Sequence, residues 1–141
     1  MTPTLMGRIQ TRWFLLVIIG VPWTLLLMLP VALGAGAAYL DLLLAGLRVL
    51  GIVGVLGTLW ELAYHALMQL RWEKDWPALF ALVTIVNEGA LLFGVTWLLG
   101  FPLDAVGWWH FVSTWLLMWV FVNGPMRVLA PRWRFRGGRV V

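Results

Sequence analysis

Four long apolar runs constrain the fold of this chain more than any other feature. Each is close to the roughly 20 residues that an α-helix needs to cross the hydrocarbon core of a bilayer. We expect helices in all four, because an isolated strand in lipid would leave its backbone hydrogen-bonding groups unpaired. The runs cover about 13–33, 42–68, 77–99 and 108–123.

The amino-acid composition points to the same class of protein. Apolar residues make up 62% of the chain and charged residues 11%, against roughly 45–50% and about 25% in soluble globular domains. The chain contains no cysteine, which excludes disulfides and thiolate metal sites. We therefore predict an all-α integral membrane protein, a single membrane domain over 1–141, folded as a four-helix transmembrane bundle with short loops.

Local signals refine the ends of these runs. Pro22 and Pro30 interrupt the first run, whose apolar stretch exceeds the roughly 7–15 residues of a signal-peptide core. We therefore expect this run to remain as a span. Asp75 is placed to cap the third helix, and Pro77 falls in its first turn, where proline is tolerated.

The basic residues predict the orientation. Nine of the ten lie beside the runs on one side, which the positive-inside rule makes cytoplasmic. We therefore expect a multi-pass protein of the cytoplasmic (inner) membrane with both termini inside. The exception is Arg48, which we expect near the outer interface, where it could snorkel or pair with Asp41 or Asp104. The nine are Arg8, Arg12, Arg71, Lys74, Arg127, Arg132, Arg134, Arg136 and Arg139.

The chain is rich in tryptophan, with 11 residues. Several of them stand at predicted span ends, as interfacial aromatic belts require. We interpret them as belt and bundle-packing residues, and contacts to a pigment or a quinone are the alternative. The tryptophans at span ends are Trp13, Trp72, Trp76, Trp108 and Trp109.

Two carboxylates, Glu61 and Glu88, lie inside the apolar runs, where ionisable groups are costly and are candidates for function. A rise of about 1.5 Å per residue places Glu61 about 15 Å and Glu88 about 16 Å from the cytoplasmic ends of their spans. Thr24 and Thr114 come out at similar depth. These four side chains are therefore predicted to form a polar layer near mid-membrane.

Helical phase predicts which of these groups face the interior. An advance of 100° per residue places Gly54, Gly57 and His65 within about 40° of the Glu61 face. Glycines let a neighbouring helix approach closely, so this face is expected to point into the bundle. The resulting candidate intramembrane cluster is Glu61, His65, Asn87, Glu88 and Thr114.

The cluster allows three interpretations. In the structural one, Glu61 bonds to His65 and Glu88 to Asn87 or a threonine, each bond contributing on the order of 0.6–2 kcal/mol, or a partner protein supplies the counter-charge. In the second, the carboxylates handle protons or cations, with Glu88 neutral in a low-dielectric site. In the third, a metal or a pigment binds at His65 with Glu61 and Glu88, or at His110. His110 lies roughly 12 Å higher by helix rise, so we expect no metal or cofactor.

The segment after the fourth run, residues 125–141, is a basic cytoplasmic tail that alternates cationic and aromatic side chains. If extended, it would present a cationic edge opposite an aromatic one. We expect anionic lipid headgroups as its partner, an acidic protein as the next choice, and no nucleic acid. The lipid- or partner-binding candidates are Arg132, Trp133, Arg134, Phe135 and Arg136.

No catalytic motif is present, and Ser113, the only serine, has no adjacent base. We therefore expect a protein that is not an enzyme. The sequence favours a structural or accessory subunit of a larger membrane assembly, bound to other membrane subunits or to copies of itself. The rival is a small oligomeric transporter or channel in which Glu61 and Glu88 handle protons or cations.

Overall fold

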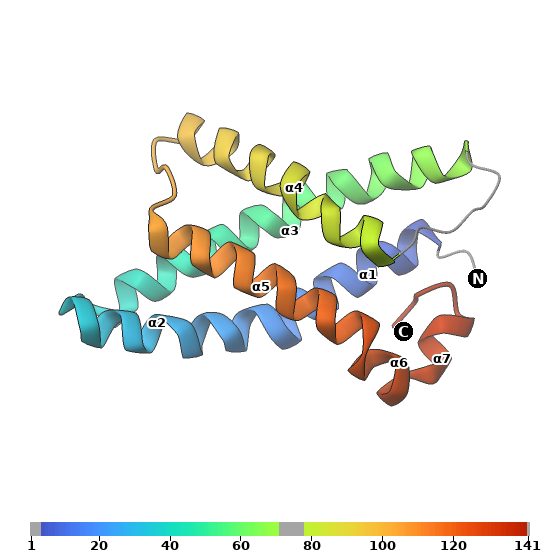
Figure 1. Cartoon of the computed structure of the whole chain (residues 1–141), viewed down its shortest axis with the longest axis horizontal. Coiled ribbons are helices and arrows are strands. Elements are labelled where there is room, and N and C mark those ends of the chain that lie inside the picture. The colour runs from blue at the N-terminus through green and yellow to red at the C-terminus, as the bar shows by residue number, and fades with distance from the viewer. Residues whose placement is uncertain (1–3, 71–77, 141) are drawn as a thin grey trace.

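The computed structural model describes residues 4–70 and 78–140, and every regular element in these ranges is a helix. Four helices are long and apolar enough to cross a membrane, and they pack along their lengths (Figure 1). This architecture suggests a multi-pass membrane protein. The first span consists of α1 (Leu5–Leu15), the π-helical turn η1 (Leu16–Gly20) and α2 (Val21–Ala35); the others are α3 (Tyr39–Gln69), α4 (Ala78–Leu98) and α5 (Ala105–Asn123), followed by the short α6 (Pro125–Leu129) and α7 (Pro131–Phe135).

The first span begins at Leu5, well before the apolar run that predicts it. Thr4 caps the helix, because its hydroxyl accepts a hydrogen bond from the backbone N–H of Gly7 at 3.1 Å. Arg8 and Arg12 therefore lie on the helix itself and do not precede the span as the charge pattern predicts. This early start carries both arginines into the bundle.

The first span continues through both of its prolines. The N–H of Val21 bonds to the carbonyl of Leu16, five residues earlier, which makes the turn between α1 and α2 a π-turn. Such a widened turn accommodates Pro22, whose ring cannot donate a hydrogen bond and clashes with the carbonyl four residues back in a regular α-helix. Pro30 lies inside α2. The first span is therefore one continuous helical rod. Arg12 and Thr24 lie on this rod about 18 Å apart by helix rise.

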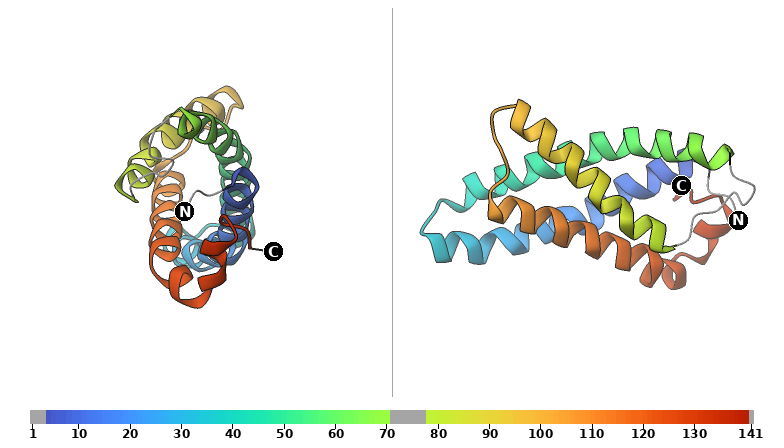
Figure 2. Two further views of the ribbon diagram at one scale, coloured as in Figure 1. Left: turned by 90° about the vertical axis from the view of Figure 1, so that its right-hand side faces the viewer. Right: turned by 45° about the horizontal axis from the view of Figure 1, so that its top comes forward.

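Buried side chains from every span meet in the middle of the bundle, and Figure 2 shows the four spans end-on around one interior. The glycines of α3 let the first span approach closely, since Gly46 faces Met28 and Gly54 faces Trp13. The outer surface is apolar, as a lipid environment requires, and Leu33 is 78% exposed. The central cluster is Leu16, Val49, Leu50, Val53, Leu92 and Phe111.

The two ends of the bundle differ in how the chain turns. At one end, Gly36 and Gly100 take the left-handed conformation where α2 and α4 finish, and Asp104 caps α5 through the N–H of Gly107. Both termini lie at the opposite end, where α6 and α7 fold back (Figure 1). The predicted helix start at Asp75 and Pro77 and the tryptophans Trp72 and Trp76 lie outside the described residues.

Candidate functional site

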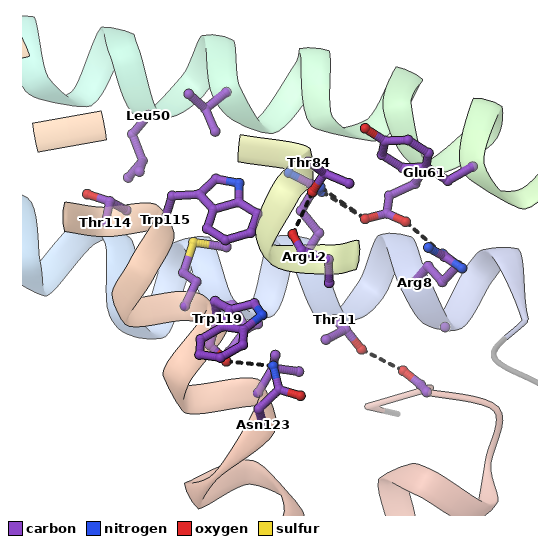
Figure 3. A pocket seen from close by; sticks show the side chains of 18 of the residues that line it. Arg8, Thr11, Arg12, Leu50, Glu61, Thr84, Thr114, Trp115, Trp119 and Asn123 are labelled. Carbon is purple, nitrogen blue, oxygen red and sulfur yellow. Dashed lines mark hydrogen bonds and ion pairs between the residues drawn. The ribbon is translucent and has the colours of Figure 1, made fainter. Parts of the chain in front are cut away.

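Arg12 of α1 lies between Glu61 and Glu88, the two carboxylates of the apolar spans. Its guanidinium binds Glu88 of α4 through two nitrogens, with Nη2–Oε1 at 2.7 Å and Nη1–Oε2 at 2.9 Å. The same group binds Oε1 of Glu61 on α3, from Nη2 at 3.0 Å and from Nε at 3.2 Å. One cation thus joins three spans. Figure 3 shows Arg8 and Arg12 on either side of the Glu61 carboxylate.

Arg8, one turn before Arg12, completes this charged cluster. Its Nε donates to Oε2 of Glu61 at 2.7 Å, and its Nη1 contacts the sulfur of Met68 at 3.7 Å. Two arginines and two glutamates sum to no net charge. Buried ions are tolerated when they are paired and hydrogen-bonded, and the side chain of Glu88 is only 4% exposed. The charged cluster is therefore compensated within the chain.

Gly57 makes room for this arrangement. A Cβ atom at position 57 would stand 2.6 Å from Cζ of Arg12, which is closer than real side-chain contacts allow. Gly57 lies one turn before Glu61 on the same face of α3. The helix that approaches this face is α1, which packs along α3. Of the two glycines that helical phase assigns to the Glu61 face, Gly57 therefore admits a cation and Gly54 admits the side chain of Trp13.

The five residues of the predicted polar cluster do not gather at one point. Glu61 and Glu88 are joined through Arg12. His65 instead contacts Gln69, Nε2 to Nε2 at 3.3 Å, and Asn87 is exposed on α4. The hydroxyl of Thr114 is buried without a hydrogen-bond partner in the described part of the chain. The partners of the two carboxylates are thus arginines, and not the histidine and the amide that we expected.

A second, neutral cluster ties α2 to α5. Nε2 of His110 lies 2.8 Å from Oγ1 of Thr24, whose hydroxyl also donates to the carbonyl of Gly20 at 2.7 Å. Nearby, the indole N–H of Trp23 donates to Oγ of Ser113 at 2.8 Å. His110 is 1% exposed and Thr24 is fully buried. The structure therefore places Thr24 with His110, away from the two carboxylates.

A cavity of about 380 Å³ connects the two clusters. Arg12 and Glu61 line one part of it, and His110 and Thr114 line another. It is formed because α1 packs on α3 while α5 packs on α2, η1, α3 and α4, leaving a wedge between α1 and α5. Figure 3 shows the indole of Trp115 in this wedge. Apart from its polar ends the lining is mostly aromatic and aliphatic.

The C-terminal tail is folded, in contrast to the extended edge considered above. Residues 131–135 form α7, so the alternating pattern is wound into a helix. Trp133 donates its indole N–H to Oγ1 of Thr11 at 2.7 Å, and Thr11 donates to the carbonyl of Gly138 at 2.7 Å. Trp133 and Gly138 also line the cavity. The tail therefore forms part of the cavity wall at the end where the termini lie.

Close backbone approach holds the tail on α1. The N–H of Thr4 donates to the carbonyl of Gly137 at 2.8 Å. A Cβ at Gly7 would stand 2.8 Å from the carbonyl carbon of Gly138, so glycine is required there. Arg132 and Arg136 remain exposed on this tail, and their binding to lipid headgroups stays a prediction.

Arg8 and Arg12 are the site residues that sequence reasoning missed. The positive-inside rule treats arginines before an apolar run as flanking groups, which hid their role as counter-charges. A signal was present: Thr4 is a good helix cap, and a helix starting there places Arg8 and Arg12 on one face, one turn apart. Reading the helix from its cap, and not from its first apolar residue, would have found them.

Comparison with known proteins gives no relative: no family model, no curated protein and no solved structure matches this chain. Within residues 4–70 and 78–140, no three His, Asp or Glu side chains converge as a metal-ligand set. The function must therefore be inferred from the geometry of the chain itself.

Proposed function

We propose that this chain is a small polytopic subunit with a structural or accessory role in a larger membrane protein assembly. The charged cluster supports this role, because it fastens α1, α3 and α4 together with no net charge. The observation that carries the proposal lies elsewhere. Arg48 is an exposed cation on an apolar groove at the end of the bundle opposite the termini.

The groove has a volume of about 510 Å³ and lies between one face of α3 and the end of α4. Val95 and Phe101 line one side of it, and the residues of that face of α3 are Arg48, Gly51, Ile52, Val55 and Leu56. The Cα of Gly51 faces open space. A glycine next to an apolar groove permits the close approach of another membrane helix.

Arg48 forms no ion pair among the described residues, and the expected pairing with Asp41 or Asp104 does not occur. An unpaired cation on an apolar helix face is costly, and such residues usually pair or mark a functional surface. A carboxylate on another membrane-spanning chain would supply the missing charge. We therefore propose that the partner is a span bearing Asp or Glu at the depth of Arg48.

We further propose that both termini are cytoplasmic and that the protein belongs to the inner membrane. Arg127, Arg132, Arg136 and Arg139 lie after α5, toward the end where the termini meet (Figure 1). Arg48 lies toward the other end. This asymmetry supports the proposed orientation by the positive-inside rule, and it makes anionic headgroups natural contacts for the tail.

The rival transport role gains little support from the geometry. A carboxylate that handles protons or cations needs free bonding capacity, whereas Glu88 is bound by two nitrogens of Arg12. Glu61 accepts from both Arg8 and Arg12. These are the strong, charge-assisted bonds of a structural ion pair.

Site-specific photocrosslinking in intact cells tests the proposal. A photoreactive residue at Val55, 57% exposed in the groove, is compared with one at Val86, which is 66% exposed on α4 and outside the groove lining. We expect a heteromeric adduct from position 55 only. Arg48→Gln should abolish this adduct, and Arg48→Lys should retain it because the charge remains.

Three results would contradict the subunit proposal. Identical adducts from both positions would indicate unspecific proximity. An adduct of twice the chain mass would show that the chain associates with a copy of itself and not with a different protein. An adduct unaffected by Arg48→Gln would show that the partner supplies no counter-charge to Arg48, which is the observation that carries the proposal.

A further inference from the structure

The cavity has the size and lining of a small-molecule site. Ligand pockets measure roughly 300–1,000 Å³ and are mainly apolar, with a few polar groups that orient the ligand, and this cavity has a volume of about 380 Å³. Its apolar wall includes Leu50, Phe111 and Trp115. Trp133 of the tail forms part of its wall at one end. What it would bind is decided by the polar atoms in its wall.

The hydrogen bonds around His110 determine its tautomer. The Thr24 hydroxyl has a single proton, which it donates to the carbonyl of Gly20 at 2.7 Å. Its oxygen then accepts from His110, so Nε2 of the neutral imidazole carries the proton. Nδ1 is left with a lone pair, and it is buried without a partner among the described residues. His110 lines the cavity, whereas Thr24, the partner of its Nε2, does not.

Thr114 supplies a second unused polar atom on the same helix. It lies one turn beyond His110 on α5, and side chains at this spacing are neighbours on one helix face. Thr114 is 4% exposed, and its hydroxyl has no partner in the described chain. This hydroxyl can donate a hydrogen bond while Nδ1 of His110 can only accept one. The pair therefore matches a group that both donates and accepts, which is a hydroxyl.

The rest of the lining requires a neutral, apolar molecule. The guanidinium of Arg12 is already hydrogen-bonded to Glu61 and Glu88. The charges at this end of the cavity are therefore neutralised without an ionised ligand. Phe111 and Trp115 offer aromatic surfaces beside the His110–Thr114 pair. Buried polar atoms left unpaired cost about 1–3 kcal/mol each, and a ligand hydroxyl would satisfy both at once.

We propose that this cavity binds a hydrophobic alcohol or phenol, whose hydroxyl donates to Nδ1 of His110 and accepts from Oγ1 of Thr114. The apolar body of the ligand lies against Leu50, Phe111 and Trp115. The site is separate from the Arg48 groove and does not depend on the proposed subunit role.

The test uses the purified full chain in detergent and two matched probes, para-nonylphenol and its methyl ether. Binding is measured by native mass spectrometry and by equilibrium dialysis. We expect one phenol per chain and at least a tenfold weaker affinity for the ether, because the ether cannot donate to Nδ1. Dodecanoate serves as an ionised competitor and should not displace the phenol.

Thr114→Val removes the hydroxyl at nearly constant volume and should lower the phenol affinity about tenfold, because the ligand oxygen loses the donor of one hydrogen bond. Thr96→Val is the matched control. Thr96 is fully buried on α4 with its hydroxyl bonded to the carbonyl of Leu92, and it does not line the cavity. This variant should bind the phenol like the parent chain, and circular dichroism of both variants checks the fold.

Equal affinities for phenol and ether would overturn the proposal, because the cavity would then recognise only apolar bulk. Binding of neither probe would also overturn the proposal, because ordered water would then be the partner of His110 Nδ1 and Thr114 Oγ1. Displacement by dodecanoate would assign the cavity to anionic amphiphiles. A Thr114→Val chain that keeps its full phenol affinity would also contradict the proposed contact.

Discussion

The charged cluster and the His110 cluster are two polar regions of one bundle with opposite character. Around Arg12, every charge has an opposite charge in contact, and the cluster joins three spans. Around His110 there is no charge pair, and two buried polar atoms, His110 Nδ1 and Thr114 Oγ1, have no partner among the described residues. Charge in an apolar run is thus not by itself the mark of a working site, because charges that are fully paired hold the fold together. The neutral cluster keeps unused hydrogen-bonding capacity in His110 Nδ1 and Thr114 Oγ1.

The largest expected effect comes from removing the cation of the charged cluster. Arg12→Met leaves Glu61 and Glu88 buried beside one remaining arginine, and breaking a buried ion pair from one side costs about 3–5 kcal/mol. Unfolding in mixed micelles of increasing denaturing detergent measures the loss. Arg139→Gln, an exposed basic residue of the tail, is the control and should change stability little. Equal midpoints for the two variants would show that the charged cluster does not hold the bundle.

Gly57→Ala tests the same region by size alone. The added methyl group meets the guanidinium of Arg12, and overpacking of this kind costs about 1–3 kcal/mol. Gly94→Ala on α4 is the matched control, because nothing lies within 4 Å of its Cβ position. The same detergent titration should separate the two variants. If both remain as stable as the parent chain, the close contact between α1 and α3 at Gly57 is wrong.

A smaller effect is expected in the neutral cluster. Ser113→Ala removes the acceptor of the Trp23 indole N–H, and interhelical hydrogen bonds of neutral groups contribute about 0.6 kcal/mol in membrane proteins. The detergent midpoint should shift by far less than in Arg12→Met. The emission of Trp23 should change with the loss of its hydrogen bond, compared with the matched variant Ser113→Thr. A loss as large as that of Arg12→Met would remove the contrast between the two clusters.

The smallest effect on global stability is expected where the tail meets α1. Gly7→Ala introduces a methyl group against the backbone of Gly137 and Gly138, so the tail must shift while the spans keep their packing. Hydrogen exchange at the N–H of Thr4, which bonds to Gly137, should become faster. Gly34→Ala, at an open position on α2, provides the control. Unchanged exchange in Gly7→Ala would place the tail away from α1.

The sequence predicts the class of the fold well, because apolar run length and composition are properties of single segments. It also predicts that Gly54 and Gly57 face a neighbouring helix, since phase along α3 is local. It does not predict that Arg8 and Arg12 are the counter-charges, because the apolar run begins at Trp13 and the cap at Thr4 decides where the helix starts. The predicted depth of Thr24 is wrong, because it assumes that the first span starts at Trp13, whereas the helix starts at Leu5.

Glu88 serves as a counter-charge to Arg12, and a double-mutant cycle measures the coupling between the two side chains. The parent chain, Arg12→Met, Glu88→Gln and the double variant are unfolded under one detergent condition. We predict a coupling free energy near the upper end of the usual range of about 0.5–3 kcal/mol. The double variant should therefore lose less stability than the two single variants lose in total. Losses that add within about 0.5 kcal/mol would show that Arg12 and Glu88 act independently, and would contradict the account.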